Sequence, residues 1–149
     1  MYTRILVPVD GSPASNAGLA EAVKVAKLTG AQIRLLHVVD ENPFLTGSEA
    51  YGALAGDVLN LLREAGEDIL QDARTRVTTA GVAVDTAMFD SLSGRLSDRV
   101  MEQVAEWGAD LVVIGTHGRR GVRRMMLGSD AEQILRTAQV PVLLVREGG

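Results

Sequence analysis

The chain has 149 residues, of which 46% are hydrophobic and 23% charged, with a formal net charge of −4 and no cysteine. This length and composition are those of a globular protein, and we expect residues 1–149 to form a single domain. The lack of cysteine excludes disulfide scaffolds, thiolate zinc sites and cysteine nucleophiles. Two tyrosines, two phenylalanines and one tryptophan are too few for the stacking platform of a single-strand nucleic-acid binder.

The first residues do not have the pattern of a targeting signal. Met1 to Arg4 lead directly into a short apolar run, without an extended apolar region or a small-residue cleavage site. No uninterrupted apolar stretch approaches the roughly 18 residues of a membrane span. We therefore expect a cytoplasmic protein that does not insert into membranes.

Short apolar runs alternate with longer amphipathic stretches from the start of the chain. Residues 5–9 predict a buried strand. Ser12 and Pro13 then provide a hydroxyl N-cap and a proline at the first helical position, and the predicted helix ends at Gly30. Residues 33–39 predict the second strand.

The segment Asp40 to Gly56, rich in glycine and alanine, is predicted to be one long irregular loop, either a lid or a mobile connection. Ser129 is predicted to begin the last helix, with Ser129 to Glu132 as a capping box. The apolar stripe of the preceding long helix consists of Val58, Leu62, Ala65, Ile69, Ala73 and Val77, ending at Ala80-Gly81. The other predicted elements are a helix at 96–107 and strands at 82–89, 111–114 and 142–145.

Five strands alternating with four helices predict an α/β fold, a Rossmann-like, doubly wound, five-stranded parallel sheet with helices on both faces. The continuous apolar strands fit a sheet that is covered on both sides. In such sheets ligands bind beyond the carboxyl ends of the strands. The candidate site segments are therefore Asp10-Gly11-Ser12, Val38-Val39-Asp40, Asp90-Ser91 and Gly115-Thr116-His117-Gly118.

Three known signatures fail on this chain. The dinucleotide fingerprint GxGxxG would follow the first strand, where residues 8–13 read Pro-Val-Asp-Gly-Ser-Pro instead. A P-loop needs a lysine in its glycine loop, and the only lysines are Lys24 and Lys27. A phosphoacceptor receiver domain would suit Asp10 and Asp90, but the lysine that such domains carry after the fifth strand is missing.

The strongest local feature runs from the fourth strand into the last helix. Gly115 and Gly118 follow the strand, and Gly128 and Ser129 open the helix. Glycines let a backbone approach a ligand closely, and a helix N-terminus offers free amides to an anion. Guanidinium groups suit phosphate oxygens, and the intervening arginines are Arg119, Arg120, Arg123 and Arg124. The segment therefore predicts a phosphate site without a lysine.

This segment resembles the ATP-binding branch of the universal stress protein family, whose signature is G-x2-G-x9-G followed by serine or threonine. Gly115, Gly118, Gly128 and Ser129 match it position by position. The resemblance covers the whole chain, because residues 5–12, 36–39, 109–115 and 140–145 look like the family's first, second, fourth and last strands. It implies an adenine nucleotide alpha hydrolase-like fold with strand order 3-2-1-4-5, and ATP with Mg²⁺ as the ligand.

The same resemblance places the nucleotide between Asp10 and Gly115. Asp130 stands where family members often carry valine, so its acid either points into solvent or helps to hold the cation. The adenine and ribose residues would be Pro8, Val9, Asp10 and Val38, the floor residues Ile114 and Gly115, and the phosphate residues Gly118, Gly128 and Ser129. His117 and Arg119 complete the predicted site as candidate phosphate contacts, and Asp130 is included in it as a residue that could help to hold the cation.

The last strand, Val142 to Val145, is apolar and would lie at an edge of the sheet. Apolar edge strands are usually paired or covered. Family members resemble one another in pairing through this strand, which implies a homodimer or a higher oligomer.

Several of these residues have a plainer interpretation. Asp10 and Ser129 both suit helix N-termini without any ligand. His37 is more readily a packed, hydrogen-bonded histidine than a metal ligand, since no second ligand lies at metal spacing. His117 can be a phosphate contact or a general base, and the arginines can form a solvated loop, a phosphate contact or a subunit contact.

Three functions remain open. Positioning groups are abundant and catalytic groups scarce, which favours a nucleotide-binding stress or regulatory protein with little or no rapid hydrolysis. The second hypothesis is a slow ATPase or nucleotidyl-transferring enzyme, in which His117 or Asp10 would assist water. The third makes the Arg119 to Arg124 loop a nucleic-acid contact, which the net acidity of the chain disfavours.

Overall fold

Five parallel strands form the central sheet. The computed structural model describes residues 1–39, 52–90, 95–116 and 128–147, and main chain alone for 52–57. The strands are β1 (Arg4–Pro8), β2 (Gln32–Val39), β3 (Val84–Asp90), β4 (Leu111–Gly115) and β5 (Val142–Val145). They pair in parallel in the order β3-β2-β1-β4-β5. The predicted order is confirmed, and the winding of the sheet reverses between β1 and β4.

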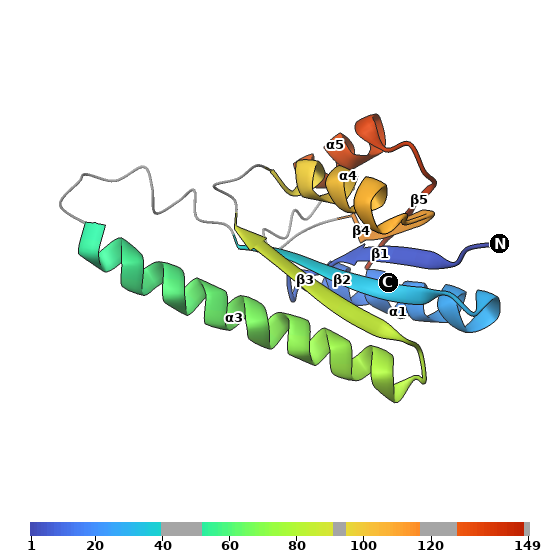
Figure 1. The fold of residues 1–149 in the computed structure, drawn as a ribbon, viewed down its shortest axis with the longest axis horizontal. Helices are drawn as coiled ribbons and strands as arrows, with labels where there is room; N and C mark the ends of the chain where they lie inside the picture. Colours follow the sequence, from blue (N-terminus) through green and yellow to red (C-terminus); the bar gives the residue numbers. More distant parts are fainter. Residues whose placement is uncertain (40–51, 91–94, 117–127, 148–149) are drawn as a thin grey trace.

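Two helices cover each face of the sheet: α1 (Pro13–Thr29) and α3 (Gly52–Thr79) on one, α4 (Leu96–Trp107) and α5 (Ser129–Thr137) on the other (Figure 1). Side chains of β1 alternate between them, with Ile5 and Val7 in the α1 and α3 layer and Leu6 in the α4 and α5 layer. All three are fully buried. Burial on both faces explains why the central strands are continuous apolar runs.

The ends of α1 are set by local chemistry, as the sequence predicts. The Ser12 hydroxyl accepts a hydrogen bond from the Ser15 N–H at 3.1 Å, and Pro13 opens the helix. At the other end, Gly30 takes a left-handed conformation with φ 78°, and its N–H bonds to the Ala26 carbonyl. A residue with a Cβ would be strained at that φ, so glycine is the suitable helix terminator.

Helix α3 is longer than the sequence predicts. It begins at Gly52, so the predicted loop from Asp40 to Gly56 is wrong for its last five residues, whereas residues 40–51 lie outside the described part. Ala53, Leu54 and Ala55 are strong helix formers, and adding residues to an existing helix is favourable. The stripe also differs, because Ala65 is exposed and Gly66 is buried in its place.

The predicted capping box at the start of α5 is wrong. Gly128 is the N-cap, Ser129 is the first helical residue, and no side chain caps the helix. The N–H of Gly128 donates to the Thr116 carbonyl, which fixes Gly128 in extended conformation just before the helix. Glu132 does not fold back to the N-terminus but pairs with Arg136 at 2.8 Å.

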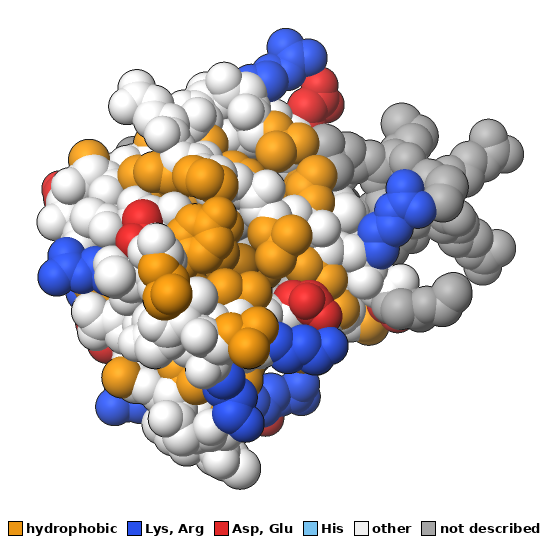
Figure 2. Space-filling view, turned by 90° about the vertical axis from the view of Figure 1, so that its right-hand side faces the viewer, with side chains coloured by type: hydrophobic (Ala, Val, Ile, Leu, Met, Phe, Trp, Pro, Cys, Tyr) orange, Lys and Arg blue, Asp and Glu red, His pale blue; other side chains and the backbone are white. Residues whose placement is uncertain are grey.

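Figure 2 shows the face on the right of Figure 1, where the strands begin. Apolar side chains gather at its centre, and charged side chains lie around them. Within the described ranges, no helix combines the length and the apolar character that crossing a bilayer requires. The opposite face, where the strands end, carries the candidate site.

Candidate functional site

The carboxyl edge of the sheet collects the predicted site residues that the structure describes. Pro8, Val38, Ile114 and Gly115 lie at the ends of the three central strands, and β1 pairs with both β2 and β4. Val9 and Asp10 follow directly, with the Val9 N–H bonded to the Leu36 carbonyl. Gly128, Ser129 and Asp130 join them at the start of α5. His117, Gly118 and Arg119 lie outside the described residues.

Asp10 is held in the turn between β1 and α1. One carboxylate oxygen, Oδ1, accepts the N–H of Ser12 at 2.9 Å, while the Asp10 N–H donates to the Ser15 hydroxyl at 3.1 Å. Asp10 therefore has a structural role at the start of α1. The other carboxylate oxygen, Oδ2, has no hydrogen bond or ion pair to any described residue. That oxygen, on a half-buried side chain, is an acceptor available to a ligand.

Gly11, next in this turn, has φ 81° and packs against α3, where a Cβ would meet Ile69 at 3.3 Å. The turn that carries Asp10 is thus in contact with α1 and α3 together. Such support from two helices gives a short turn a defined position, as a binding site requires.

Gly115 has a role in packing. A Cβ at this position would lie 2.4 Å from the Ala14 carbonyl oxygen, so the backbone of α1 already occupies that space. A Cβ on Gly18, one turn further along α1, would lie 3.1 Å from the Gly115 amide nitrogen. The first glycine of the motif therefore allows α1 to pack directly on the end of β4, whether or not a ligand also approaches it.

Among the described residues, no side chain caps the N-terminus of α5. Its first intrahelical bond joins the Glu132 N–H to the Gly128 carbonyl, which leaves the N–H groups of Ser129 and Ala131 without a carbonyl from the helix. Ser129 is an exposed residue. Free amides and the positive end of the helix dipole form a favourable environment for an anion.

Thr116 lies in one of the candidate segments at this edge, although the sequence predicts no role for it. Its N–H donates to the Val145 carbonyl and its own carbonyl accepts from Gly128, so it joins β4, β5 and α5. Its hydroxyl is buried, with 8% of the residue exposed, and has no hydrogen-bond partner in the described part of the chain. What the sequence shows at this position is a hydroxyl residue that directly follows an apolar strand. Buried hydroxyls without partners are rare and concentrate at functional sites.

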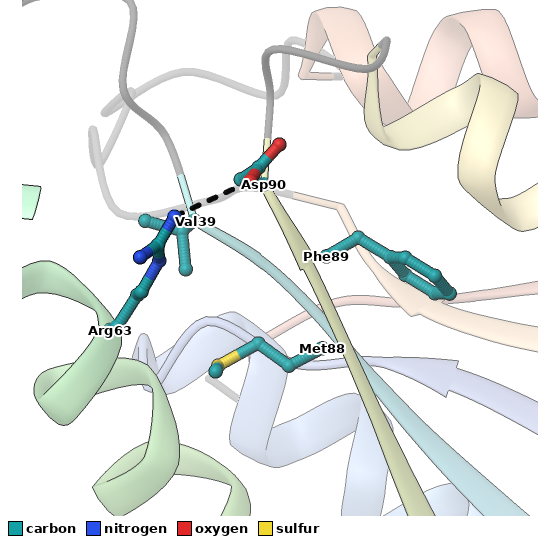
Figure 3. Close-up of a pocket in the computed structure, with 5 residues that line it drawn as sticks. All are labelled: Val39, Arg63, Met88, Phe89 and Asp90. Carbon is teal, nitrogen blue, oxygen red and sulfur yellow. Dashed lines mark ion pairs between the residues drawn. The ribbon is translucent and has the colours of Figure 1, made fainter.

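A hollow of about 340 Å³ lies further along the same edge, between β2, β3 and α3. Figure 3 shows Arg63 reaching from α3 toward Asp90 at the end of β3, with Val39 and Met88 beside them and the Phe89 ring pointing away. The Arg63 and Asp90 side chains form an ion pair at 3.6 Å. The strand-end position of Asp90 is visible in the sequence, whereas the contribution of Arg63 depends on the packing of α3.

His37 is packed and hydrogen-bonded, as predicted. It is 8% exposed, and its Nδ1 lies 2.8 Å from the Val9 carbonyl oxygen. Among the described residues, no group of three or more histidine and acidic side chains is placed to hold a metal ion.

Comparison with known proteins gives a single family. A sequence model described as the universal stress protein family matches residues 1–146. Universal stress protein MJ0531 of Methanocaldococcus jannaschii is 34% identical over 147 residues, covering 99% of this chain and 84% of that protein. Universal stress protein YxiE of Bacillus subtilis is 30% identical over 152 residues, covering 98% of this chain and 100% of its own length.

Solved structures agree on the fold. Universal stress protein UspA from Lactobacillus plantarum superposes with a TM-score of 0.84 at 26% identity, covering 97% of this chain and 98% of that one. Two more distant structures contain nucleotides, a universal stress protein in complex with cAMP (TM-score 0.68, 22% identity) and an Arabidopsis thaliana family member with AMP bound (TM-score 0.71, 17% identity). Each covers 99% of this chain. The match spans 98% of the chain in the cAMP complex and 93% of the chain in the AMP complex. From its sequence and its fold together, the chain belongs to the universal stress protein family.

Proposed function

We propose that this protein binds ATP, with Mg²⁺, at the carboxyl edge of the sheet and acts as a nucleotide-dependent regulatory protein of the stress response. One observation carries the proposal: the available Asp10 oxygen and the uncapped N-terminus of α5 lie at the edge where the sheet reverses its winding. A carboxylate suits ribose hydroxyls, and free helix amides suit phosphates. The same fold holds cAMP in one family member and AMP in another.

The proposed roles follow the family resemblance residue by residue. The Asp10 carboxylate would bind the ribose, and the open end of α5 would face the phosphates. The base and ribose contacts would be completed by Pro8, Val9 and Val38, and the floor of the site by Ile114 and Gly115. The phosphate contacts would be His117, Gly118, Arg119, Gly128 and Ser129.

The Mg²⁺ ion would arrive with the nucleotide. Mg²⁺ in nucleotide sites keeps several waters and is bound by phosphates with one or two carboxylates. A cage of protein ligands is therefore not required. Asp130, exposed in the first turn of α5, is the acid nearest in sequence to the proposed phosphate residues.

Calorimetry with ATP, with and without Mg²⁺, tests the proposal. Asp10→Asn keeps an oxygen for the Ser12 N–H but replaces the available oxygen with an NH₂ group, so we expect affinity to fall about tenfold or more. Asp68→Asn, an exposed carboxylate on α3, is the matched control and should bind as the wild type does. A wild-type protein that binds no nucleotide at millimolar concentration refutes the function and leaves the fold intact.

A slow ATPase or nucleotidyl-transferring enzyme is the alternative function. Purified protein separates the two hypotheses. Turnover that is abolished by His117→Ala at unchanged ATP affinity supports the enzyme. Tight binding without turnover refutes it.

We also propose that two chains pair along β5. Each residue of β5 is half-buried, and β5 is the last strand of the sheet, with β4 as its neighbour in the described structure. An apolar edge of this kind is a template for a second copy of the strand. A strictly monomeric mass in solution at micromolar concentration would rule this pairing out.

A further inference from the structure

The peptide bond between Val9 and Asp10 is held from both sides. On one side, the Val9 carbonyl oxygen lies 2.8 Å from Nδ1 of His37 in β2. On the other side, the Asp10 N–H donates to the Ser15 hydroxyl of α1 at 3.1 Å. In a planar trans peptide the C=O and N–H groups point in opposite directions. The two bonds together therefore fix the rotation of this peptide plane, and with it the direction of the Asp10 side chain.

The bond to Val9 also fixes the tautomer of His37. A carbonyl oxygen accepts hydrogen bonds and cannot donate them, so the hydrogen must lie on Nδ1. His37 is 8% exposed, and its bond to Val9 is shielded from water. A shielded bond of this kind is stronger than one in solvent and is costly to leave unmade.

Helix α3 provides the space for the His37 ring. A Cβ on Gly66 would lie 2.7 Å from His37 Cδ2 and 3.1 Å from Met88 Sδ. Glycine is less favourable than alanine inside a helix, but at Gly66 it leaves room for the ring. The position of α3 on the sheet and the position of the His37 ring are thus linked through direct contact.

We propose that His37 is a positioning residue for the nucleotide site. Its Nδ1–H bond to the Val9 carbonyl, with Gly66 leaving space for the ring, orients the Val9–Asp10 peptide and directs the available Asp10 oxygen to the ligand. The inference rests on the proposed function, in which that oxygen binds the ribose. His37 itself touches no nucleotide, and its effect on binding is transmitted by Asp10.

A matched pair of amide variants tests the donor position. In His37→Asn the side-chain amide can occupy the place of Nδ1, whereas in His37→Gln it reaches the place of Nε2. We expect His37→Asn to bind ATP within about threefold of wild type, and His37→Gln and His37→Leu to bind about tenfold more weakly, the value of one buried hydrogen bond. Gly66→Ala, which displaces the ring, should weaken binding in the same direction.

A double-mutant cycle tests whether the effect passes through Asp10. In an Asp10→Ala background, His37→Leu should cause almost no further loss of affinity, because the group that His37 orients is gone. Gln103→Leu is the control for general destabilisation, since Gln103 is buried in α4 on the other face of the sheet and bonds Arg34. That variant should keep the ATP affinity of the wild type.

The outcomes separate this inference from the proposed function. A wild-type chain that does not bind ATP overturns the function itself. If the wild type binds ATP and His37→Gln binds it as well as His37→Asn does, the role of His37 is overturned. The role is also overturned if the losses of ATP affinity in His37→Leu and Asp10→Ala simply add in the double variant. Imidazole ¹⁵N chemical shifts of the wild type give a test that requires no variant, because a hydrogen on Nε2 instead of Nδ1 would also contradict it.

Discussion

Asp110 joins the start of β1 to the start of β4 through one carboxylate. It accepts the Thr3 N–H at 2.9 Å, the Thr3 hydroxyl at 2.9 Å and the Arg4 N–H at 3.0 Å. Desolvation by itself would raise the pKa of Asp110, but the hydrogen bonds from Thr3 and Arg4 outweigh it and hold that pKa below its ordinary value. The folded protein therefore stabilises the ionised form of this residue.

The sign of the pH dependence follows from this lowered pKa. The contribution of Asp110 to stability is present above its ordinary pKa, near 3.9, and is lost as the pH falls through the folded value. We expect Asp110→Asn to lower the free energy of unfolding at pH 7 by about 1 kcal/mol, the value for hydrogen bonds to a charged group reduced by solvent exposure. Urea unfolding at pH 7 and pH 3 measures it, and an equal difference at both pH values contradicts the assignment.

Single residues differ in how far the sequence predicts them. Ser12 and Gly30 act on neighbours in the chain, so their capping roles follow from local pattern. The fit between Gly66 and His37 joins α3 to β2, and the Thr116 hydroxyl, which has no partner among the described residues, is buried where β4, β5 and α5 meet. Neither environment can be predicted from neighbouring residues alone, since both depend on residues distant in sequence.

At the level of secondary structure, α1 packs directly on the end of β4, next to the proposed site. The two glycines of the motif that the structure describes differ in their surroundings. A Cβ on Gly115 would lie 2.4 Å from the backbone of α1, whereas a Cβ on Gly128 would lie 3.3 Å from the Thr116 carbonyl oxygen. The backbone of a packed helix cannot move aside as a flexible side chain can.

Gly115→Ala should therefore destabilise the fold by about 3 kcal/mol or more, because it overpacks the helix against the strand. Gly128→Ala should cost about 1 kcal/mol or less, since Gly128 has an ordinary φ of −62° and glycine is only a modest N-cap. Urea unfolding of the two variants measures the difference. Equal costs would contradict the packing role of Gly115.

The outward edge of β5 gives a second prediction for a single element. The Pro141 carbonyl accepts from Val112 in β4 and the Val145 carbonyl from Thr116 just after it, so by the alternation of a strand the backbone of Leu144 faces outward. Leu144→Pro removes an N–H that β4 does not use, and Leu144→Ala removes only the side chain. We expect Leu144→Ala to stay dimeric and Leu144→Pro to become monomeric by sedimentation at micromolar concentration. Two dimeric variants would exclude backbone pairing at this edge.

The elements themselves were predictable where the hydrophobic pattern was long. All five strands and four helices in the described part of the chain correspond to predicted ones, with strand ends shifted by one or two residues. The start of α3 was not predictable, because Gly52 and Gly56 resemble loop residues although the alanines and leucine between them extend the helix. The cap of α5 failed for a different reason, since a tertiary bond from Gly128 to Thr116 decided it.

Across the whole molecule, the two ends of the sheet are chemically different. At the end where the strands begin, Asp110 is saturated with donors, and the guanidinium groups of Arg4 and Arg34 lie 5.9 and 4.6 Å from the Trp107 ring centre. At the end where they finish, the Thr116 hydroxyl, an Asp10 oxygen and the start of α5 lack partners among the described residues. Polar groups left without partners cost stability, and proteins retain them where function needs them.

Together with the proposed function, this asymmetry predicts how ATP should act on the entire fold. A ligand that binds only the folded state at 100 times its dissociation constant adds about 2.7 kcal/mol of stability. For a chain of 149 residues, each 1 kcal/mol raises the melting temperature by about 2–4 °C. We therefore expect saturating ATP to raise it by about 5–11 °C, and by clearly less in Asp10→Asn at the same ATP concentration. Amide exchange should slow most at Asp10, Thr116 and Ser129, so equal protection at both ends of the sheet would place the nucleotide elsewhere.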